Sequence, residues 1–443
     1  MIPWRLALVL ATLLALQAAG PAVASPPRLS ADPSPLAGHW EGQWVRDGAS
    51  LDVWVDFSHS DSGYAGSFGS DALRALDIPF RSVQSDSTGV HWLLVGDATT
   101  LRFEGKVAGD ALGGRFKDGD APGTFRLRRT AESSTPPYSS VDVHFTNGAV
   151  TLAGTLMMPA GSAPCPAIVF VHGSGPEGRY ASRYLADRFA RAGFAALIYD
   201  KRGVGASGGD WKRSGFGDLA GDALAAIRML AADRRVRAGA IGVYGHSQGG
   251  TIAPLIASQS RDLGFVIASA AGGVPLIEGE RYSYSNHLGV PRLPGADSLR
   301  ATSYVDAVVR AAYEGGGWER ADSAARANGK ESWIQPIPGP EDSFWWLAHE
   351  TARYDAPSYW RRVKVTVLLV YGERDERVPV NPSLERIRAA LHEAGDEDVT
   401  WKIFPESDHT FRINESNDGH FRWPRTPDGY LETLIGWARS KSR

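Results

Sequence analysis

The chain has 443 residues, of which 43% are hydrophobic and 22% are charged, and its formal net charge is −3 at pH 7. This length favours more than one domain, and the composition is typical of a globular protein with a hydrophobic core. So weak a net charge gives no electrostatic reason to expect a nucleic-acid partner. Cys165 is the single cysteine, which excludes an intrachain disulfide and a multi-cysteine zinc site.

The first residues have the pattern of a secretory signal. Arg5 precedes the apolar run LALVLATLLAL, and Ala22 and Ala24 follow at the spacing of a cleavage site. The run is shorter than the roughly 20 residues that a membrane span needs, so a cleaved signal is favoured over an anchor. We expect a signal peptide at residues 1–24, a disordered Pro/Ser-rich leader at residues 25–35, and an exported bacterial protein, periplasmic or extracellular, with no stable membrane span after cleavage.

Residues 36–130 predict a small all-β domain. The segment LDVWVDF, residues 51–57, alternates apolar and polar positions, as a half-buried strand does. HWLLV, LRFEGKV and TFRLRR are further strand-like pieces, divided by Gly- and Asp-rich turns. Because no stretch here has a sustained helical period, we expect a small barrel or sandwich. The segment AESSTPPYSS, residues 131–140, is typical of a linker.

Residues 141–443 predict an α/β domain. A hairpin comes first, with Asn147 and Gly148 as its two-residue turn. Apolar strands then alternate with amphipathic helices, a pattern that indicates a mostly parallel sheet covered by helices on both faces. The predicted strands are Ala167–Val171, Ala195–Tyr199, Ile241–Tyr244, Phe265–Ala270, Val365–Tyr371 and Val399–Phe404. A long, Trp- and Tyr-rich insertion at about residues 276–360 interrupts the alternation and is expected to lie as a cap over one end of the sheet.

The strongest catalytic signal is the sequence GHSQG, residues 245–249, which has the form G-x-S-x-G. An apolar strand precedes it and a helix follows, which is the setting of a nucleophile elbow. Gly245 and Gly249 flank Ser247 at two residues on either side, where a Cβ would hinder so sharp a turn. Ser247 is therefore the predicted nucleophile, at the positive end of a helix dipole that favours an incoming anion.

A serine hydroxyl needs a base, and the fold predicts the chain order Ser, acid, His. His409 follows the last predicted strand in the segment FPESDHTF, which makes it the predicted base; His392, in a helix-like stretch, and His420, in a polar loop, are weaker candidates. Asp375, at the tip of the turn after the preceding strand, is the predicted acid that orients the imidazole. The neighbouring Glu373 and Glu376 are interpreted as solvated loop charges.

Together GHSQG, YGERDERVP and SDHTF resemble the α/β-hydrolase superfamily over about residues 141–443. HGSGP (172–176) and YDKRGVGASGG (199–209) are similar to the bacterial esterase branch near the dienelactone-hydrolase and prolyl-oligopeptidase-like enzymes. The N-terminal β domain resembles the small lipocalin-like domain that precedes some such enzymes. The resemblance implies that the backbone N–H groups of Ser174 and Gln248 form the oxyanion hole, and that no cofactor or metal is required.

The glycine-rich loop also has the pattern of a dinucleotide-binding site. Gly173, Gly175 and Gly178 spell G-x-G-x-x-G after an apolar strand, and Asp200 follows about 20 residues on, as in dinucleotide-binding proteins. The same pattern recurs at residues 203–208 without opening a helix, and a dinucleotide site leaves GHSQG unexplained. We therefore expect the loop to bind the charge of a tetrahedral intermediate rather than a pyrophosphate. Asp200 and Arg202 are interpreted as structural.

The predicted function is the hydrolysis of small carboxylic esters through an acyl-enzyme on Ser247. A prolyl-oligopeptidase-type serine peptidase is an alternative, although residues 36–130 are too few for that family's propeller. A thioesterase, an acyltransferase, or an inactive hydrolase whose β domain holds a lipid are further alternatives. Specificity is expected to reside in the cap, whose aromatic residues line the pocket or simply pack; they are Tyr282, Tyr284, Phe344, Trp345 and Trp346. The sequence does not indicate an oligomeric state.

Overall fold

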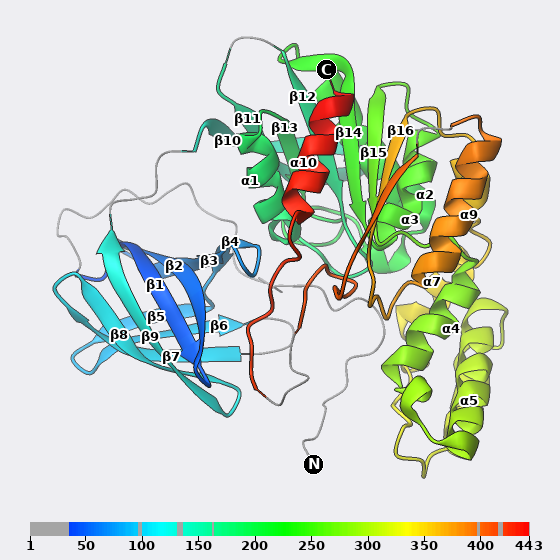
Figure 1. The fold of residues 1–443 in the computed structure, drawn as a ribbon, viewed down its shortest axis with the longest axis horizontal. Coiled ribbons are helices and arrows are strands. Elements are labelled where there is room, and N and C mark those ends of the chain that lie inside the picture. The colour runs from blue at the N-terminus through cyan, green and yellow to red at the C-terminus, as the bar shows by residue number, and fades with distance from the viewer. Residues whose placement is uncertain are drawn as a thin grey trace.

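The computed structural model of the protein describes residues 35–95, 100–130, 136–161, 164–396, 399–414 and 420–442. The predicted signal peptide lies outside the described residues, as do the predicted leader up to residue 34 and residues 131–135 of the predicted linker. Figure 1 shows an all-β domain, an α/β domain and a group of helices that extends from the α/β domain. Within the described ranges, no helix is both long enough and apolar enough to cross a membrane.

The all-β domain is one antiparallel sheet of nine strands in the order β4-β3-β2-β1-β9-β8-β7-β6-β5. Each strand pairs with the next along the chain, except that β4 and β5 are the two edges of the sheet and β1 pairs with β9, which is an up-and-down arrangement. The strands are β1 (Gly38–Arg46), β2 (Ala49–Ser60), β3 (Gly63–Ser70), β4 (Ala75–Pro79), β5 (Ser82–Asp86), β6 (Gly89–Val95), β7 (Thr100–Ala108), β8 (Ala111–Asp118) and β9 (Ala121–Thr130).

This sheet curls until its two edge strands meet. Phe80 and Arg81 join β4 to β5, and the Phe80 N–H donates to the Gly66 carbonyl of β3 at 2.9 Å while the Arg81 N–H donates to Leu93 of β6 at 2.8 Å. Aromatic side chains fill the interior, with the ring centroids of Trp92 and Phe103 4.7 Å apart in a stacked pair. The predicted alternation at residues 51–57 is explained because Leu51, Val53, Val55 and Phe57 all face this core.

The α/β domain is built on an eight-stranded sheet in the order β10-β11-β13-β12-β14-β15-β16-β17, in which β11 runs antiparallel to both of its neighbours, β10 and β13, and the other pairs are parallel. The mostly parallel sheet is therefore as predicted. Its strands are β10 (Tyr138–Asn147), β11 (Val150–Pro159), β12 (Cys165–Val171), β13 (Ala195–Tyr199), β14 (Val236–His246), β15 (Leu263–Ser269), β16 (Thr366–Gly372) and β17 (Thr400–Phe404).

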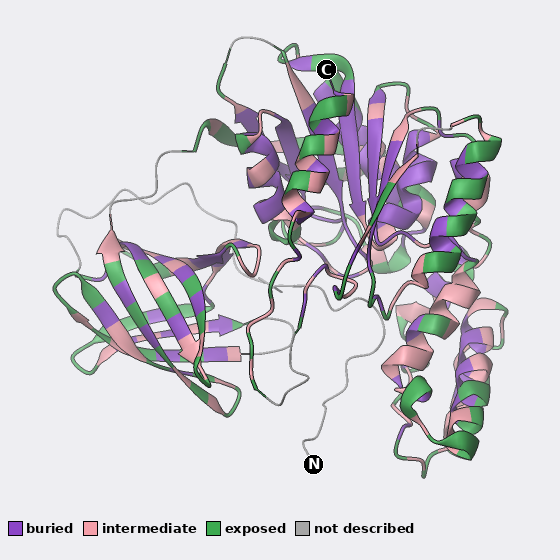
Figure 2. Ribbon diagram, viewed as in Figure 1, coloured by how far each residue is buried: buried purple, intermediate pink, exposed green. Residues whose placement is uncertain are grey.

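Helices cover both faces of this sheet, whose central strands are largely buried while the edge strands β10 and β17 are largely exposed (Figure 2). On one face lie α1 (Arg183–Arg191) and α10 (Tyr430–Lys441). On the other face lie α2 (Phe216–Ala231), α3 (Gln248–Ala257), α8 (Ala356–Trp360) and α9 (Val380–Glu393). Three short 3-10 turns complete this part of the chain: η1 (Arg179–Ser182), η2 (Trp211–Arg213) and η3 (Val290–Arg292).

The insertion between β15 and β16 is helical and has a core of its own. It contains α4 (Leu276–His287), α5 (Gly295–Tyr313), α6 (Gly317–Ala327) and α7 (Ser343–Thr351) before α8 returns to the sheet. Tyr304, Trp333 and Trp345 are buried among these helices. The helices project from the end of the sheet at which β14 and β16 stop, so the insertion is placed to line whatever site forms there (Figure 1).

Each of the two domains, the β domain and the α/β domain, packs an apolar side chain against the core of the other. Leu76 of the β domain packs against the core cluster beneath α1 and α10. In the other direction, Trp423 packs against the core of the β domain, and its indole N–H donates to the Ala49 carbonyl at 3.1 Å. Of the described residues that follow His409, Trp423 thus lies against the β domain, and α10 packs on the α/β sheet.

Candidate active site

A sharp turn between β14 and α3 presents Ser247. Its backbone has φ 54° and ψ −113°, a left-handed conformation that a serine rarely adopts. A Cβ on Gly245 would lie 2.2 Å from the Gly249 carbonyl oxygen, and a Cβ on Gly249 would lie 2.4 Å from the Val171 carbonyl oxygen. Only glycines fit at these two positions, which is the physical reason for the G-x-S-x-G pattern.

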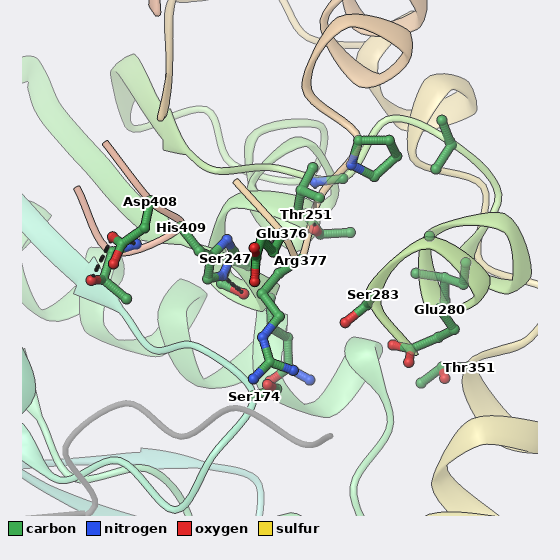
Figure 3. Close-up of a pocket in the computed structure, with 18 of the residues that line it drawn as sticks. Ser174, Ser247, Thr251, Glu280, Ser283, Thr351, Glu376, Arg377, Asp408 and His409 are labelled. Carbon is green, nitrogen blue, oxygen red and sulfur yellow. Dashed lines mark hydrogen bonds between the residues drawn. The ribbon is translucent and has the colours of Figure 1, made fainter. Parts of the chain in front are cut away.

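The structure brings the three residues of the predicted triad together. His409 lies in the loop after β17, and its Nε2 is 2.9 Å from the Ser247 Oγ (Figure 3). Its Nδ1 is 2.8 Å from Asp375 Oδ2. Asp375 follows β16, is almost fully buried, and its other oxygen accepts the N–H groups of Arg377 at 2.7 Å and Val378 at 2.8 Å. The carboxylate is thus fixed from one side and faces the imidazole with the other.

Two further histidines near the site are held neutral. Burial, and next the charge of Lys201, lowers the pKa of His172 to about 4, and its Nε2–H donates to the Tyr199 carbonyl at 2.5 Å. Burial lowers the pKa of His246 well below its usual value, with the charge of His409 adding to the effect. The ring centroids of His246 and His409 are 5.1 Å apart. A second positive charge is therefore kept away from the imidazole that faces Ser247.

The two predicted oxyanion residues, Ser174 and Gln248, line the same cavity as Ser247 and His409. Gln248 is the first residue of α3, so its N–H has no carbonyl partner within the helix and is available to an anion. Ser174 lies between Gly173 and Gly175 in the loop after β12. Both N–H groups therefore belong to backbone at the edge of the cavity, as an oxyanion hole requires.

Lys201 ties these two segments together, and the sequence analysis missed it. Its Nζ donates to the carbonyls of Gly173 at 2.7 Å and Gly175 at 3.1 Å and to the Gln248 side-chain oxygen at 3.0 Å. The side chain is buried, and burial lowers its pKa to about 8. A lysine at the end of a buried strand, in the segment YDKRG, was the available signal, because a buried lysine needs specific partners.

The cavity in front of Ser247 has a volume of about 520 Å³. The cap supplies its far wall, where Glu280, Ser283 and Thr351 face the catalytic side across the opening (Figure 3). Glu280 is half-buried and lines the cavity. Burial raises the pKa of its carboxyl to about 7. This carboxyl was not singled out from the sequence, since nothing in its local segment distinguishes it from a surface charge.

One of the aromatic residues of the cap lines the cavity, and others make contacts elsewhere. Phe344 lines the cavity with Ser247. Tyr282 instead donates its hydroxyl hydrogen to the Asp375 carbonyl at 2.8 Å, which links the cap to the acid loop. The indole N–H of Trp345 donates to a carbonyl within the cap at 2.9 Å, and Trp346 stacks beneath Arg213.

The weaker candidates for base and acid lie elsewhere. His392, in α9, and His420 are both exposed and are not part of the cavity wall. Glu373 accepts the N–H of Glu406 at 2.9 Å, and Glu376 is an exposed residue on the cavity wall.

Asp200 and Arg202 make structural contacts outside the cavity wall. Asp200 forms an ion pair with Arg179 at 2.9 Å, and Arg202 pairs with Asp222 at 2.6 Å. Among the described residues, no three His, Cys, Asp or Glu side chains gather as metal ligands would.

Comparison with known proteins gives a family match and several similar proteins. The chain is 29% identical to esterase EstD of Thermotoga maritima over 204 residues, which cover 43% of this chain and 48% of that esterase. The match therefore spans about half the length of this curated relative.

Two solved structures are similar to part of this chain. The Pyrococcus furiosus esterase Pf2001 is 17% identical with a TM-score of 0.46, covering 71% of this chain and 97% of that chain. Est1E of Butyrivibrio proteoclasticus with ferulic acid bound is 16% identical with a TM-score of 0.43, covering 67% and 96%. Residues 147–404, more than half of the chain, match the family described as X-Pro dipeptidyl-peptidase (S15 family), and the protein therefore belongs to this hydrolase family.

Proposed function

We propose that the protein is a serine esterase that hydrolyses small carboxylic esters through an acyl-enzyme on Ser247. The observation that carries the proposal is the continuous chain of hydrogen bonds from Ser247 through His409 to Asp375, at the wall of a cavity large enough for a small ester. Similarity to an esterase over part of the chain supports the same substrate class.

In the first half of the reaction, His409 Nε2 takes the proton of the Ser247 hydroxyl while Oγ forms a bond to the ester carbonyl carbon. The carbonyl π electrons move to the oxygen, which becomes an oxyanion, and the N–H groups of Ser174 and Gln248 bind that charge. The electron pair then returns, the bond to the alcohol oxygen breaks, and the His409 Nε2–H protonates the leaving alcohol. An acyl group remains on Ser247.

The second half repeats these steps with water. His409 removes a proton from water, whose oxygen attacks the acyl carbon, and the same two N–H groups hold the second oxyanion. When the bond to Ser247 Oγ breaks, the imidazole returns the proton to it and the carboxylic acid leaves. Asp375 keeps the Nδ1–H of His409 directed at itself throughout and stabilises the imidazolium that forms twice.

A serine peptidase of the prolyl type is a second candidate, because the family that matches residues 147–404 is described as an X-Pro dipeptidyl-peptidase. The same Ser247, His409 and Asp375 would serve, since an amide differs from an ester only in the leaving group that His409 protonates. A thioester has a better leaving group than an ester, so a thioesterase would use the same three residues.

The experiment measures hydrolysis of p-nitrophenyl esters from acetate to decanoate and of Ala-Pro-p-nitroanilide by the purified protein. Ser247→Ala and Asp375→Asn are run alongside, and Glu373→Gln serves as the control acid. Ester hydrolysis that disappears in Ser247→Ala and falls by about three to four powers of ten in Asp375→Asn supports the esterase. A larger kcat/KM for the anilide would replace it with the peptidase. Activity that persists in Ser247→Ala would refute both.

Three finer points belong to the same proposal. We propose that the bacterial esterase branch named above is the right one, that the β domain is a lipocalin-like barrel, and that the protein is exported after cleavage behind Ala24. The up-and-down order of β1–β9 supports the second point. N-terminal sequencing of the protein recovered from the periplasm or medium tests the third, and a sequence starting at Met1 would contradict it.

A further inference from the structure

We propose that residues 71–77 of the β domain, which comprise the turn after β3 and the first residues of β4, are a positioning element for the loop that carries His409 (the histidine loop), and that Arg74 is the positioning residue. The inference rests on the proposed function, in which His409 is the base. It gives the β domain a part in catalysis without any contact between that domain and the substrate. We call residues 71–77 the β3–β4 segment.

The β3–β4 segment holds the histidine loop through main-chain carbonyls. The Arg74 guanidinium donates to the carbonyl of Thr410, the residue after His409. In return, Arg412 donates to the carbonyl of Leu73 at 3.2 Å. These two bonds run in opposite directions between the same two segments, so they fix the distance between the segment and the loop.

A second path connects Arg74 to the imidazole from behind. The Arg74 guanidinium lies over the Tyr430 ring, 4.9 Å from its centroid, and the Tyr430 hydroxyl is 3.3 Å from that of Tyr244. Tyr244 donates to Ser269 Oγ at 3.2 Å, and His246 Nδ1 is 3.2 Å from that same oxygen. The centroid of the His246 ring is 5.1 Å from that of His409, so a chain of four side chains connects Arg74 to the back of the catalytic imidazole.

Within the histidine loop, Asp408 holds the curvature. Its Oδ1 accepts the N–H groups of Thr410 at 2.8 Å and Arg412 at 2.9 Å, and its carbonyl accepts the Phe411 N–H at 3.0 Å. Phe411 adopts a positive φ of 56° and is buried in the α/β core. A loop with strained backbone keeps its position only when its surroundings over-determine it, and the β3–β4 segment supplies the outer contacts.

The β3–β4 segment is in turn fixed to the α/β domain. Asp77 pairs with Arg183 of α1 at 2.7 Å, and Asp71 pairs with Arg188 of the same helix. Arg74 itself has a φ of 51°, a conformation that its N–H bond to the Asp71 carbonyl at 3.1 Å maintains. The two ion pairs are partly exposed and add little stability, but they set the orientation from which Arg74 reaches the loop.

The test uses the full chain and a matched pair of arginines. Arg74→Ala removes the donor, Arg74→Lys keeps a charge with a different geometry, and Arg102→Ala removes an exposed arginine elsewhere in the β domain. We measure kcat and KM for p-nitrophenyl butyrate, the melting temperature, and the low-field proton resonance of the His409 Nδ1–H. Active sites are counted from the p-nitrophenol burst, so that kcat refers to folded enzyme.

We expect kcat in Arg74→Ala to fall by about ten- to a hundredfold with KM changed by less than about twofold, because a displacement of about 1 Å of a catalytic group can cost about a hundredfold. The low-field resonance should shift or broaden, Arg74→Lys should lie between Arg74→Ala and wild type, and Arg102→Ala should match wild type.

Wild-type kcat in Arg74→Ala, or an equal loss in Arg102→Ala, would overturn the proposal. So would a loss of kcat with an unchanged histidine resonance. Ser247→Ala is measured in parallel: if it keeps activity, the proposed function fails and this inference with it. If Ser247→Ala is inactive while Arg74→Ala is normal, the proposed function stands and only the positioning role is lost.

Discussion

The backbone of Ser247 should make the protein less stable than it would be with glycine at this position. Its φ of 54° and ψ of −113° lie outside the regions that a residue with a Cβ ordinarily adopts. We compare Ser247→Gly with Ser247→Ala. Both variants lose the 2.9 Å contact with His409, so the difference between them reports the backbone alone.

The expected magnitude follows from two opposing effects. A non-glycine residue in such a conformation costs about 1–3 kcal/mol, which Ser247→Gly releases and Ser247→Ala keeps. Glycine gives back about 0.4–1 kcal/mol through the greater entropy of the unfolded chain. The glycine variant should therefore be more stable by about 1.3 kcal/mol at the middle of these ranges and by about 2.6 kcal/mol at most. For a domain of roughly 300 residues this corresponds to an increase of about 2 °C, and at most about 4 °C, in melting temperature.

Differential scanning calorimetry of both variants measures this difference, and an ordinary helical serine supplies the control. Ser303 is exposed in α5, where glycine should be less stable than alanine by about 1 kcal/mol, the opposite sign. A Ser247→Gly protein that melts at or below the temperature of Ser247→Ala, while the Ser303 pair behaves as expected, would refute the reasoning about strain at the elbow.

Three further predictions concern residues around the cavity. Because the folded pKa of Glu280 is raised to about 7, the stability that it contributes is complete below about pH 4.5 and is lost as the pH rises through 7. Urea denaturation at pH 5 and pH 7.5 should therefore show a smaller loss in Glu280→Gln than in wild type, and equal losses would contradict the assignment. Lys201→Met should lower kcat for p-nitrophenyl butyrate by about ten- to a hundredfold, since the oxyanion loop loses its tie; an unchanged kcat would count against that role. Gly249→Ala forces a Cβ to 2.4 Å from the Val171 carbonyl oxygen and should lower the melting temperature, whereas Gly217→Ala meets no atom within 4 Å and should not; similar melting temperatures would disprove the steric account.

Local patterns predicted the elements of the α/β domain well, because each buried strand is a short apolar run. β13 has the predicted bounds, Ala195–Tyr199. The main difference is β14, which begins at Val236 rather than Ile241. Its residues 237–239, Arg-Ala-Gly, are exposed and interrupt the apolar run that marks a buried strand. Val236 is nevertheless paired with Cys165 of β12, an interaction between distant parts of the chain that only the fold reveals.

The proximity of the three candidate triad side chains was predictable because chemistry limits both their types and their order along the chain. Ser247 has a motif, and the order of strands then points to Asp375 and His409. Lys201 and Arg74 have no such signal. Arg74 and Thr410 are 336 residues apart, and no local property of either residue indicates that they meet. Local sequence patterns therefore do not identify the residues of this site that position other residues.

Trp423, which packs into the β domain, has a consequence for synthesis on the ribosome. Residues 36–130 emerge early, but the side chain that covers part of their core belongs to the last twenty or so residues of the chain. At about 5–20 residues per second, translation from residue 130 to residue 423 takes about 15–60 s. Until Trp423 is synthesised, the part of the β-domain core that it covers stays exposed. A chain truncated before residue 423 would therefore lack a contact of the β domain, although the truncation lies in the α/β domain.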